Sequence, residues 1–560
     1  MSDPPGIPAG APAIPPVPAA ADASTASGAA PATPATLVVA PDAIPWLGLL
    51  AVLMGTFIST LNGRLSTFGL ADIRGAMHAG FDEGAWITTA QTVAQMLIAP
   101  AAVWMGTVFG ARRVLLAGAS AFAVISLLTP LSDGLPMLLA LQFAGGLATG
   151  VFVPLTLSFI LLNTPPKYWA FGVAVYALNL ELSLNISASL EGWYVDHLSW
   201  RWIFWQNVPL ALIMALCLYL GMRPRPRSPN LPPADRFGLA IGGLGLALIY
   251  AGFDQGNRLD WLNSGLVWGL LLSGCTMLAG FFVHEARTPH PIINLKVAFA
   301  APLPTLLLLI GFLRLTILST AYLIPLYLGS VRGFRALEVG QTTFWIAAPQ
   351  LALCPLAALM LRRSDPRLVA SIGFIFVSAA CLMVAHGLTP LWGSDQFLPS
   401  QLLQAVGQSF ALSGILFFVV LHLRPQDALT FGAMIQTARL MGGQVGQSFV
   451  VTLARIRGQV ASNLIGLHVQ SGDGEVLRRV QSYAAATARV GDTASSTVRG
   501  ASVLSNVVRS LATTQAVMDC FVVLGGLTAI ALLILVVHKP APHGAASALP
   551  LFPRRNAKTS

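Results

Sequence analysis

The sequence predicts an all-α polytopic membrane protein with about 14 transmembrane helices. Of its 560 residues, 55% are hydrophobic and only 10% are charged, whereas a soluble protein has roughly 25% charged residues. Apolar runs recur along the chain, each near the ~20 residues that a helix needs to cross ~30 Å of hydrocarbon. A membrane β-barrel would instead show short alternating strands.

Short polar, Pro-rich or Arg-bearing turns separate most of the predicted spans. A long polar segment precedes the last one. The spans cover residues 44–68, 85–108, 114–131, 135–160, 169–190, 202–221, 237–253, 264–284, 302–327, 339–361, 368–387, 398–422, 430–453 and 515–537.

Three segments are predicted to stay outside the lipid. Residues 1–41 are mostly Ala and Pro without Lys or Arg, which indicates a disordered cytoplasmic tail rather than a secretory signal. Residues 541–560 form a second cytoplasmic tail. Residues 455–511 are too hydrophilic for a span and should form an external segment with an amphipathic helix near 475–489. This segment is either a solvated cap or a docking site for a partner.

The distribution of basic residues predicts the orientation in the membrane. The predicted outer loops hold only Arg74, Arg201, Arg258, Arg332 and Arg335, and the opposite loops hold more Lys and Arg. This bias predicts that both termini are cytoplasmic. The net charge of +10 therefore reflects topology, and we expect no nucleic-acid partner.

Composition and spacing argue against an enzyme. The five cysteines fall inside apolar segments without paired or metal-like spacing, so we expect free thiols and no disulfide framework. The nine histidines are scattered. No Ser-His-Asp, metal-ligand or phosphate-cradling pattern is present, and we expect neither a metal nor another cofactor.

Four local motifs resemble the major facilitator superfamily, specifically its fourteen-span drug:proton antiporter branch of the EmrB/QacA type. The resemblance covers residues 44–540. WRWIFWQNVP is the most specific of the four motifs. They are FGARRVLL at 109–116, WRWIFWQNVP at 200–209, GFDQGNRLDW at 252–261 (an outer loop after the seventh span) and PIINL at 291–295.

The resemblance implies two six-helix halves, at 42–221 and 301–540, that rock around a central site. An inserted helix pair at 222–300 separates them. The first motif would be a gating loop with Gly110, Arg112 and Arg113. A bacterial inner membrane is the implied location.

Several motif positions lack the usual charge. Asn62 stands where the branch carries an Asp in the first span. Thr107 replaces the acid of the loop motif, and Gln142 replaces the Arg of the fourth span. The antiporter motif of the fifth span is almost erased.

Four ionisable residues are predicted inside the lipid, where each costs at least ~2.5–3.5 kcal/mol near mid-helix. Glu181, near the middle of the fifth span, is the first candidate for a proton carrier; the alternative is a structural carboxylate paired with Arg. Arg439 is a counter-charge to Glu181, an anion-binding group or a helix anchor. Arg314 should face the cavity or form a structural pair. Arg64 either joins this set or snorkels to the outer interface.

Uncharged polar side chains on three spans are candidates for the lining of a substrate cavity, although each could instead join helices through hydrogen bonds. They are Gln91, Gln95, Asn179, Asn185, Gln341 and Gln350.

The predicted function is secondary active efflux of a small amphipathic organic molecule by proton antiport. Weak acids, phenolic compounds, dyes and drugs are the expected substrates, with anionic or zwitterionic ones favoured by the midplane arginines. An uncoupled facilitator and a non-transporting sensor or scaffold are the alternatives. A periplasmic adaptor protein could meet the external segment.

Overall fold

The computed structural model describes residues 45–222, 235–288, 295–299, 303–422, 428–469, 473–487 and 493–538, which belong to one compact unit. Within these ranges all regular structure is helical. The two predicted tails, 1–41 and 541–560, lie outside the described residues.

The first half of the bundle comprises the helices up to residue 221. Gly110 (φ 82°) is the N-cap residue of α5 and has a backbone conformation that favours glycine. The predicted fourth span is divided into two helices near Gly150. The helices are α1 (Pro45–Phe68), α2 (Leu70–Ala76), α3 (Phe81–Gly84), α4 (Trp86–Val108), α5 (Ala111–Leu128), α6 (Leu135–Thr149), α7 (Phe152–Asn163), α8 (Trp169–His197), α9 (Trp202–Trp205) and α10 (Asn207–Gly221).

The inserted pair consists of α11 (Arg236–Gly256) and α12 (Gly265–Arg287), and α13 (Leu295–Ala298) follows it. Asp235 caps α11 by accepting a hydrogen bond from the backbone N–H of Gly238 at 2.9 Å. The prediction ended this span at residue 253. Because the helix continues to Gly256, Asp254 lies in the helix and not in a loop.

The second half of the bundle begins with a broken span. A π-helical turn, η4 (Ser319–Leu323), separates α14 (Leu303–Thr316) from α15 (Ile324–Arg332), whose second residue is Pro325. The proline has no N–H for a helical hydrogen bond. The remaining helices are α16 (Ala336–Arg363), α17 (Pro366–Gly387), α18 (Leu398–Val420), α19 (Ala428–Gly466), α20 (Gly474–Thr487) and α21 (Thr493–Val537).

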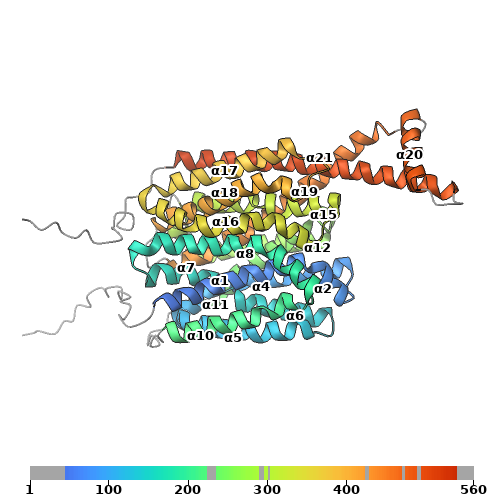
Figure 1. Ribbon diagram of the computed structural model, residues 1–560. Coiled ribbons are helices and arrows are strands. Elements are labelled where there is room, and N and C mark those ends of the chain that lie inside the picture. Colours follow the sequence, from blue (N-terminus) through green and yellow to red (C-terminus); the bar gives the residue numbers. More distant parts are fainter. Residues whose placement is uncertain are drawn as a thin grey trace, which may run out of the picture. The chain divides into compact units, whose positions relative to one another are not determined.

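The polar segment between the last two spans is largely helical. α19 has 39 residues and α21 has 45, so both extend well beyond the ~30 Å of a hydrocarbon layer. Figure 1 shows them projecting from one end of the bundle, with α20 packed on α21. An ion pair of 2.6 Å joins Arg457 of α19 to Asp519 of α21. We call this end of the bundle the hairpin end.

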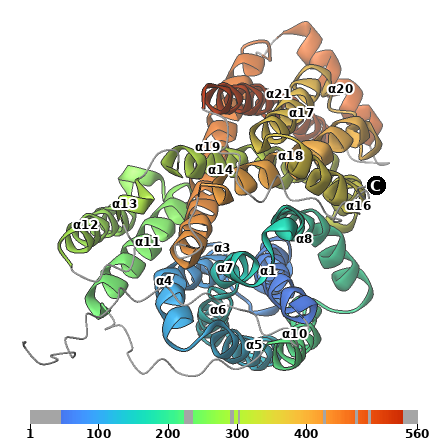
Figure 2. The same ribbon diagram turned by 90° about the vertical axis from the view of Figure 1, so that its left-hand side faces the viewer.

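The two halves face each other across the middle of the bundle (Figure 2). On one side α8 packs along α16. On the other side α11 lies against α4 of the first half and α19 of the second. The inserted pair therefore covers one of the two seams between the halves.

Twelve helical stretches among the described residues are long and apolar enough to cross a membrane. The helices α4 and α19 pack in the same bundle and coincide with the predicted spans 85–108 and 430–453. The predicted all-α polytopic class is confirmed.

Small residues permit the close approach of α17 and α18. A Cβ atom at Gly373 would lie 2.2 Å from the backbone nitrogen of Ala411, and one at Gly407 would lie 2.5 Å from Val377 Cγ2. We predict that Gly373→Leu lowers the thermal unfolding temperature of the purified protein, because overpacking costs typically about 1–3 kcal/mol. Gly269→Leu is the control, since no atom lies within 4 Å of a Cβ there. Equal unfolding temperatures for the two variants would contradict the packing.

Candidate functional site

A cavity of about 170 Å³ lies between the two halves. Its lining comes from both halves and from the inserted helix α11. Thr67 is exposed and lines the cavity, so the cavity reaches the surface at the hairpin end. The lining residues are Ser59, Thr60, Gly63, Arg64, Thr67, Thr88, Thr92, Gln95, Leu184, Tyr250, Asp254, Arg314, Ile317, Leu318, Ala321, Arg439, Leu440, Gly443, Gln444 and Gln447.

Helical periodicity explains why these residues share one chamber. Ser59, Gly63 and Thr67 are four residues apart on α1, and Tyr250 and Asp254 are four apart on α11. Residues three or four apart lie on one face of an α-helix. The helices α1 and α11 therefore each present these residues to the cavity on a single face.

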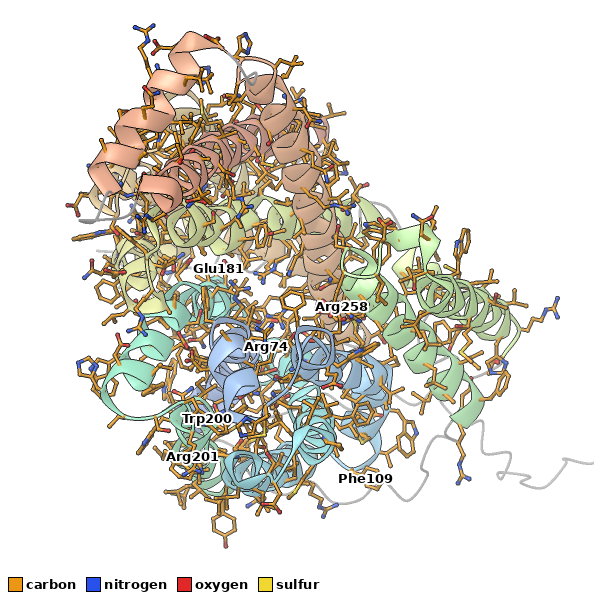
Figure 3. All side chains as sticks on the ribbon, turned by 90° about the vertical axis from the view of Figure 1, so that its right-hand side faces the viewer. Arg74, Phe109, Glu181, Trp200, Arg201 and Arg258 are labelled. Atoms are coloured by element: carbon orange, nitrogen blue, oxygen red, sulfur yellow. The ribbon has the colours of Figure 1, made fainter. Side chains whose placement is uncertain are left out.

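Glu181 of α8 forms an ion pair with Arg314 of the second half. The Arg314 Nη1 donates to Glu181 Oε1 at 3.1 Å, and the Glu181 side chain is only 1% exposed. Figure 3 shows Glu181 where the two halves meet. Between the two arginines that were candidates for its partner, the structure selects Arg314. The other carboxylate oxygen, Oε2, is buried and has no hydrogen-bond partner among the described residues.

Arg64 points into the cavity and not toward an outer interface. Its Nη2 donates to the carbonyl oxygen of Ala321 at 3.1 Å. That carbonyl lies four residues before Pro325, which has no N–H to donate to it. Arg64 of the first half therefore donates to a carbonyl of the second half that lacks the usual i+4 N–H donor.

Arg439 of α19 also reaches across the interface. Its Nη1 donates to Thr60 of α1 at 3.1 Å, and its Nη2 donates to Gln436 at 2.7 Å. The glycines beyond it bring α19 close to α14: a Cβ at Gly442 would lie 2.6 Å from Gly311 Cα. Arg439 is therefore held within the close packing of the second half while it contacts the first.

The cavity carries uncompensated positive charge. Arg314 has Glu181 as its partner, but no carboxylate of the described residues pairs with Arg64 or Arg439. The Nε atoms of both arginines are buried without a hydrogen-bond partner in that same part of the chain. Buried unpaired charge is costly, so an anionic group would be stabilised here.

The predicted lining residues lie in different places. Gln95 lines the cavity and donates to Thr149 at 3.1 Å. Gln91 is buried on the same helix, and Asn179 donates to the carbonyl of Leu53 at 3.3 Å. Gln341 is exposed on α16.

Asn185 and Gln350 belong to a buried amide network. Asn185 of α8 donates to Gln350 of α16 at 3.3 Å and to Gln408 of α18 at 3.0 Å. Gln408 donates to Thr320 at 3.3 Å. These bonds join the two halves along the α8 seam, which is the helix-joining role that polar residues have inside membranes.

The positions without the usual charge make neutral hydrogen bonds. Asn62 accepts from Asn207 at 2.7 Å, and Gln142 donates to Ser66 at 3.5 Å. Thr107 is exposed and donates to the carbonyl of Trp104. These contacts all lie within the first half.

The predicted gating loop also makes its contacts within the first half. Gly110 is the N-cap residue of α5, and Arg112 donates to the carbonyl of Tyr219 at 3.0 Å at the C-terminus of α10. Cations near a helix C-terminus are stabilised by its dipole. Arg113 is exposed. The role of this loop as a gate stays a prediction.

The bundle is closed at the end opposite the hairpin. A buried apolar cluster there includes Leu157 and Ile160 of α7 and Phe431 and Ile435 of α19. A Cβ atom at Gly432 would lie 2.3 Å from the carbonyl oxygen of Pro154. The halves therefore touch directly on this side of the cavity.

Asp254 was missed by the sequence analysis. It accepts hydrogen bonds from Thr89 of α4 and, at 3.2 Å, from Gln255. The run of Asp, Gln, Asn and Arg after residue 253 indicated a loop. The signal that could have placed it is its four-residue spacing from Tyr250.

Comparisons with known proteins agree on one family. The family model described as Major Facilitator Superfamily matches residues 52–447. The chain is 25% identical over 408 residues to the multidrug export protein EmrB of Haemophilus influenzae, covering 71% of this chain and 78% of that protein. It is 28% identical over 424 residues to the probable multidrug resistance protein EmrY of Escherichia coli strain K12, with 73% and 80% covered. The structure of the human organic anion transporter MFSD10 (TETRAN) superposes with a TM-score of 0.55 at 16% identity, covering 88% of this chain and 99% of that one.

The ion pair across the halves yields a prediction. Glu181→Gln should lower the stability of the purified protein by about 3–5 kcal/mol, because it leaves Arg314 buried without a counter-charge. Glu181→Gln combined with Arg314→Gln should restore part of the loss. Thermal unfolding in detergent measures both. The control is Glu475→Gln on α20, whose 2.8 Å pair with Arg478 is exposed and should contribute at most about 1 kcal/mol. A double variant less stable than the single one would show that the two charges do not compensate each other.

Proposed function

Because this chain belongs to the major facilitator superfamily, we propose that it is a secondary active transporter that exports small amphipathic organic molecules by alternating access. It is a membrane transporter related to EmrB-type multidrug exporters at 22–28% identity. The observation that carries the proposal is the charged cavity between the two halves, which reaches the surface at the hairpin end while a buried apolar cluster lies at the opposite end. Such a chamber can change the side to which it opens when the halves rock.

The cavity would bind the anionic part of a substrate. Arg64 and Arg439 lie in its wall without a carboxylate partner in the described part of the chain, and each contacts the opposite half. An anion bound between them replaces the missing counter-charge. Its binding would thus change the contacts that hold the halves together.

Glu181 would carry the proton. While it is paired with Arg314, its charged form is stabilised. When the halves separate, the buried carboxylate loses that partner and takes up a proton, because burial disfavours the charged form. Pairing again releases the proton, so proton movement would follow the rocking of the halves.

The orientation follows from the predicted charge bias. With both termini cytoplasmic, the hairpin end faces outward and the apolar cluster of α7 and α19 closes the cytoplasmic side. The described state is then open outward, ready to release substrate. The projecting α19–α21 hairpin with α20 would be the surface that an adaptor protein meets in the periplasm of an inner-membrane exporter.

Transport by the full-length chain in proteoliposomes tests this function. With a panel of aromatic acids and dyes, a pH gradient should drive uptake into vesicles that expose the cytoplasmic side. Arg439→Ala should abolish transport, and Glu181→Gln should remove its dependence on the gradient. Arg478→Ala, on the exposed face of α20, is the control and should transport normally. Wild-type transport that is indifferent to the gradient would indicate a facilitator, and no transport of any compound would favour a scaffold.

The closed side yields a separate prediction. Gly432→Leu should act as a wedge against Pro154 and shift the population toward the state that opens at that end. In a cysteine-free background, a Thr67→Cys probe at the hairpin end should then react several-fold more slowly with a membrane-impermeant maleimide. Gly466→Leu, at the exposed end of the same helix, is the matched control. Unchanged labelling in Gly432→Leu would contradict the alternating movement.

A further inference from the structure

We propose that the cavity selects substrates that carry both an ammonium group and an anionic group, and that Asp254 of the inserted helix α11 binds the ammonium group. The proposal rests on the transport function argued above and names its substrate class. It assigns a binding role to the inserted pair, which the sequence analysis placed outside the central site.

The position of Asp254 depends on how α11 is packed. This helix packs against both α4 and α19, which also contact each other. Asn257 donates to the carbonyl of Ser448 at 3.1 Å, and Ser448 donates to the carbonyl of Phe253 at 2.8 Å. Thr89 of α4 donates a hydrogen bond to Asp254 and so joins the same part of α11 to α4. The face with Tyr250 and Asp254 therefore forms part of the cavity wall.

The Asp254 carboxylate is held in place by hydrogen bonds and not by an ion pair within the described residues. Thr89 and Gln255 both donate to the oxygen Oδ2, and Gln444 is a further hydrogen-bonding neighbour. An ionised carboxylate can accept about four hydrogen bonds. Among the described residues none forms an ion pair with Asp254, so the carboxylate has acceptor capacity left for a cationic ligand.

The nearest arginine on the same helix is engaged elsewhere. Arg258, one turn beyond, contacts Asp82 of α3 at 2.7 Å and donates to Gln255 at 2.8 Å. Figure 3 shows Arg258 on the α11 side of the bundle, apart from Glu181. The guanidinium group of Arg258 is therefore paired with Asp82 and not with Asp254.

The opposite charges of the cavity lie on different walls. Arg64 and Arg439 each lie close enough to Arg314 to be affected by its charge, so the three arginines form one positive group. Tyr250 lines the same cavity and lies one helical turn before Asp254 on α11. An aromatic ring in the wall one turn from Asp254 is compatible with a bound cation.

This arrangement discriminates between ligands by their charge. A monoanion satisfies the arginines but leaves Asp254 desolvated when the cavity closes around it. A monocation satisfies Asp254 and leaves the arginines without a counter-charge. A zwitterion compensates both groups, and unpaired buried charge is the penalty against the other two classes.

The test uses three compounds that share a phenyl ring: phenylalanine as the zwitterion, 3-phenylpropionate as the anion and 2-phenylethylamine as the cation. Isothermal titration of the purified full-length chain should show the tightest binding for phenylalanine. Asp254→Asn should weaken phenylalanine binding about tenfold or more, which is the scale of one charge-assisted hydrogen bond. Binding of 3-phenylpropionate should change by less than about twofold. Asp254→Glu, which keeps the charge, should retain the preference for the zwitterion.

Asp260→Asn is the matched control, because this exposed residue follows the same helix and lies outside the cavity lining. Size-exclusion profiles establish that each variant is folded. If Asp254→Asn misfolds, Asp254→Ser takes its place. Loss of the preference for phenylalanine in Asp254→Ser would support the proposal, and a retained preference would overturn it. Equal phenylalanine binding by wild type and Asp254→Asn would overturn the proposal, as would wild-type preference for the anion or no binding of phenylalanine. These binding results are independent of the proteoliposome assay, which tests transport separately with a panel of aromatic acids and dyes.

Discussion

A guanidinium group in the middle of a hydrocarbon layer must find a counter-charge, hydrogen-bond acceptors or water. Three arginines at the centre of this protein meet that requirement across the interface between the halves. Arg314 pairs with Glu181, Arg64 donates to the carbonyl of Ala321, and Arg439 donates to Thr60. Each bond joins one half to the other. The groups that are most costly to bury are therefore the same groups that hold the halves in register.

The inserted helix α11 takes part in this interface. It is bonded to α4 through Thr89 and to α19 through Ser448, so it spans the seam that the two halves would otherwise leave open. A rocking movement at the hairpin end must break one set of these bonds or carry α11 with one half. The polar bonds on both sides are few and local, whereas the α8 seam is packed along its length and carries the amide network of Asn185.

The sequence predicted the helical membrane class because hydropathy follows directly from solvation. It also predicted the central charges, since an ionisable residue within an apolar run must lie inside the bundle. It could not choose the partner of Glu181, which depends on helix rotation in three dimensions. It left Arg64 between the central set and the outer interface, because its acceptor is the carbonyl of Ala321, far along the chain. Asp254 was missed because a polar run at a helix end has the composition of a loop.

The neutral residues of the first half fit this distribution of charge. Asn62 is bonded to Asn207 and Gln142 to Ser66, so the positions where the related branch carries charge are satisfied by neutral bonds within one half. Such bonds need not break when the halves move. In the proposed rocking, the charges that would change partners are those of Glu181, Arg314, Arg64 and Arg439. Coupling between ion binding and movement can therefore reside at the interface between the halves, with no carboxylate needed in the first span.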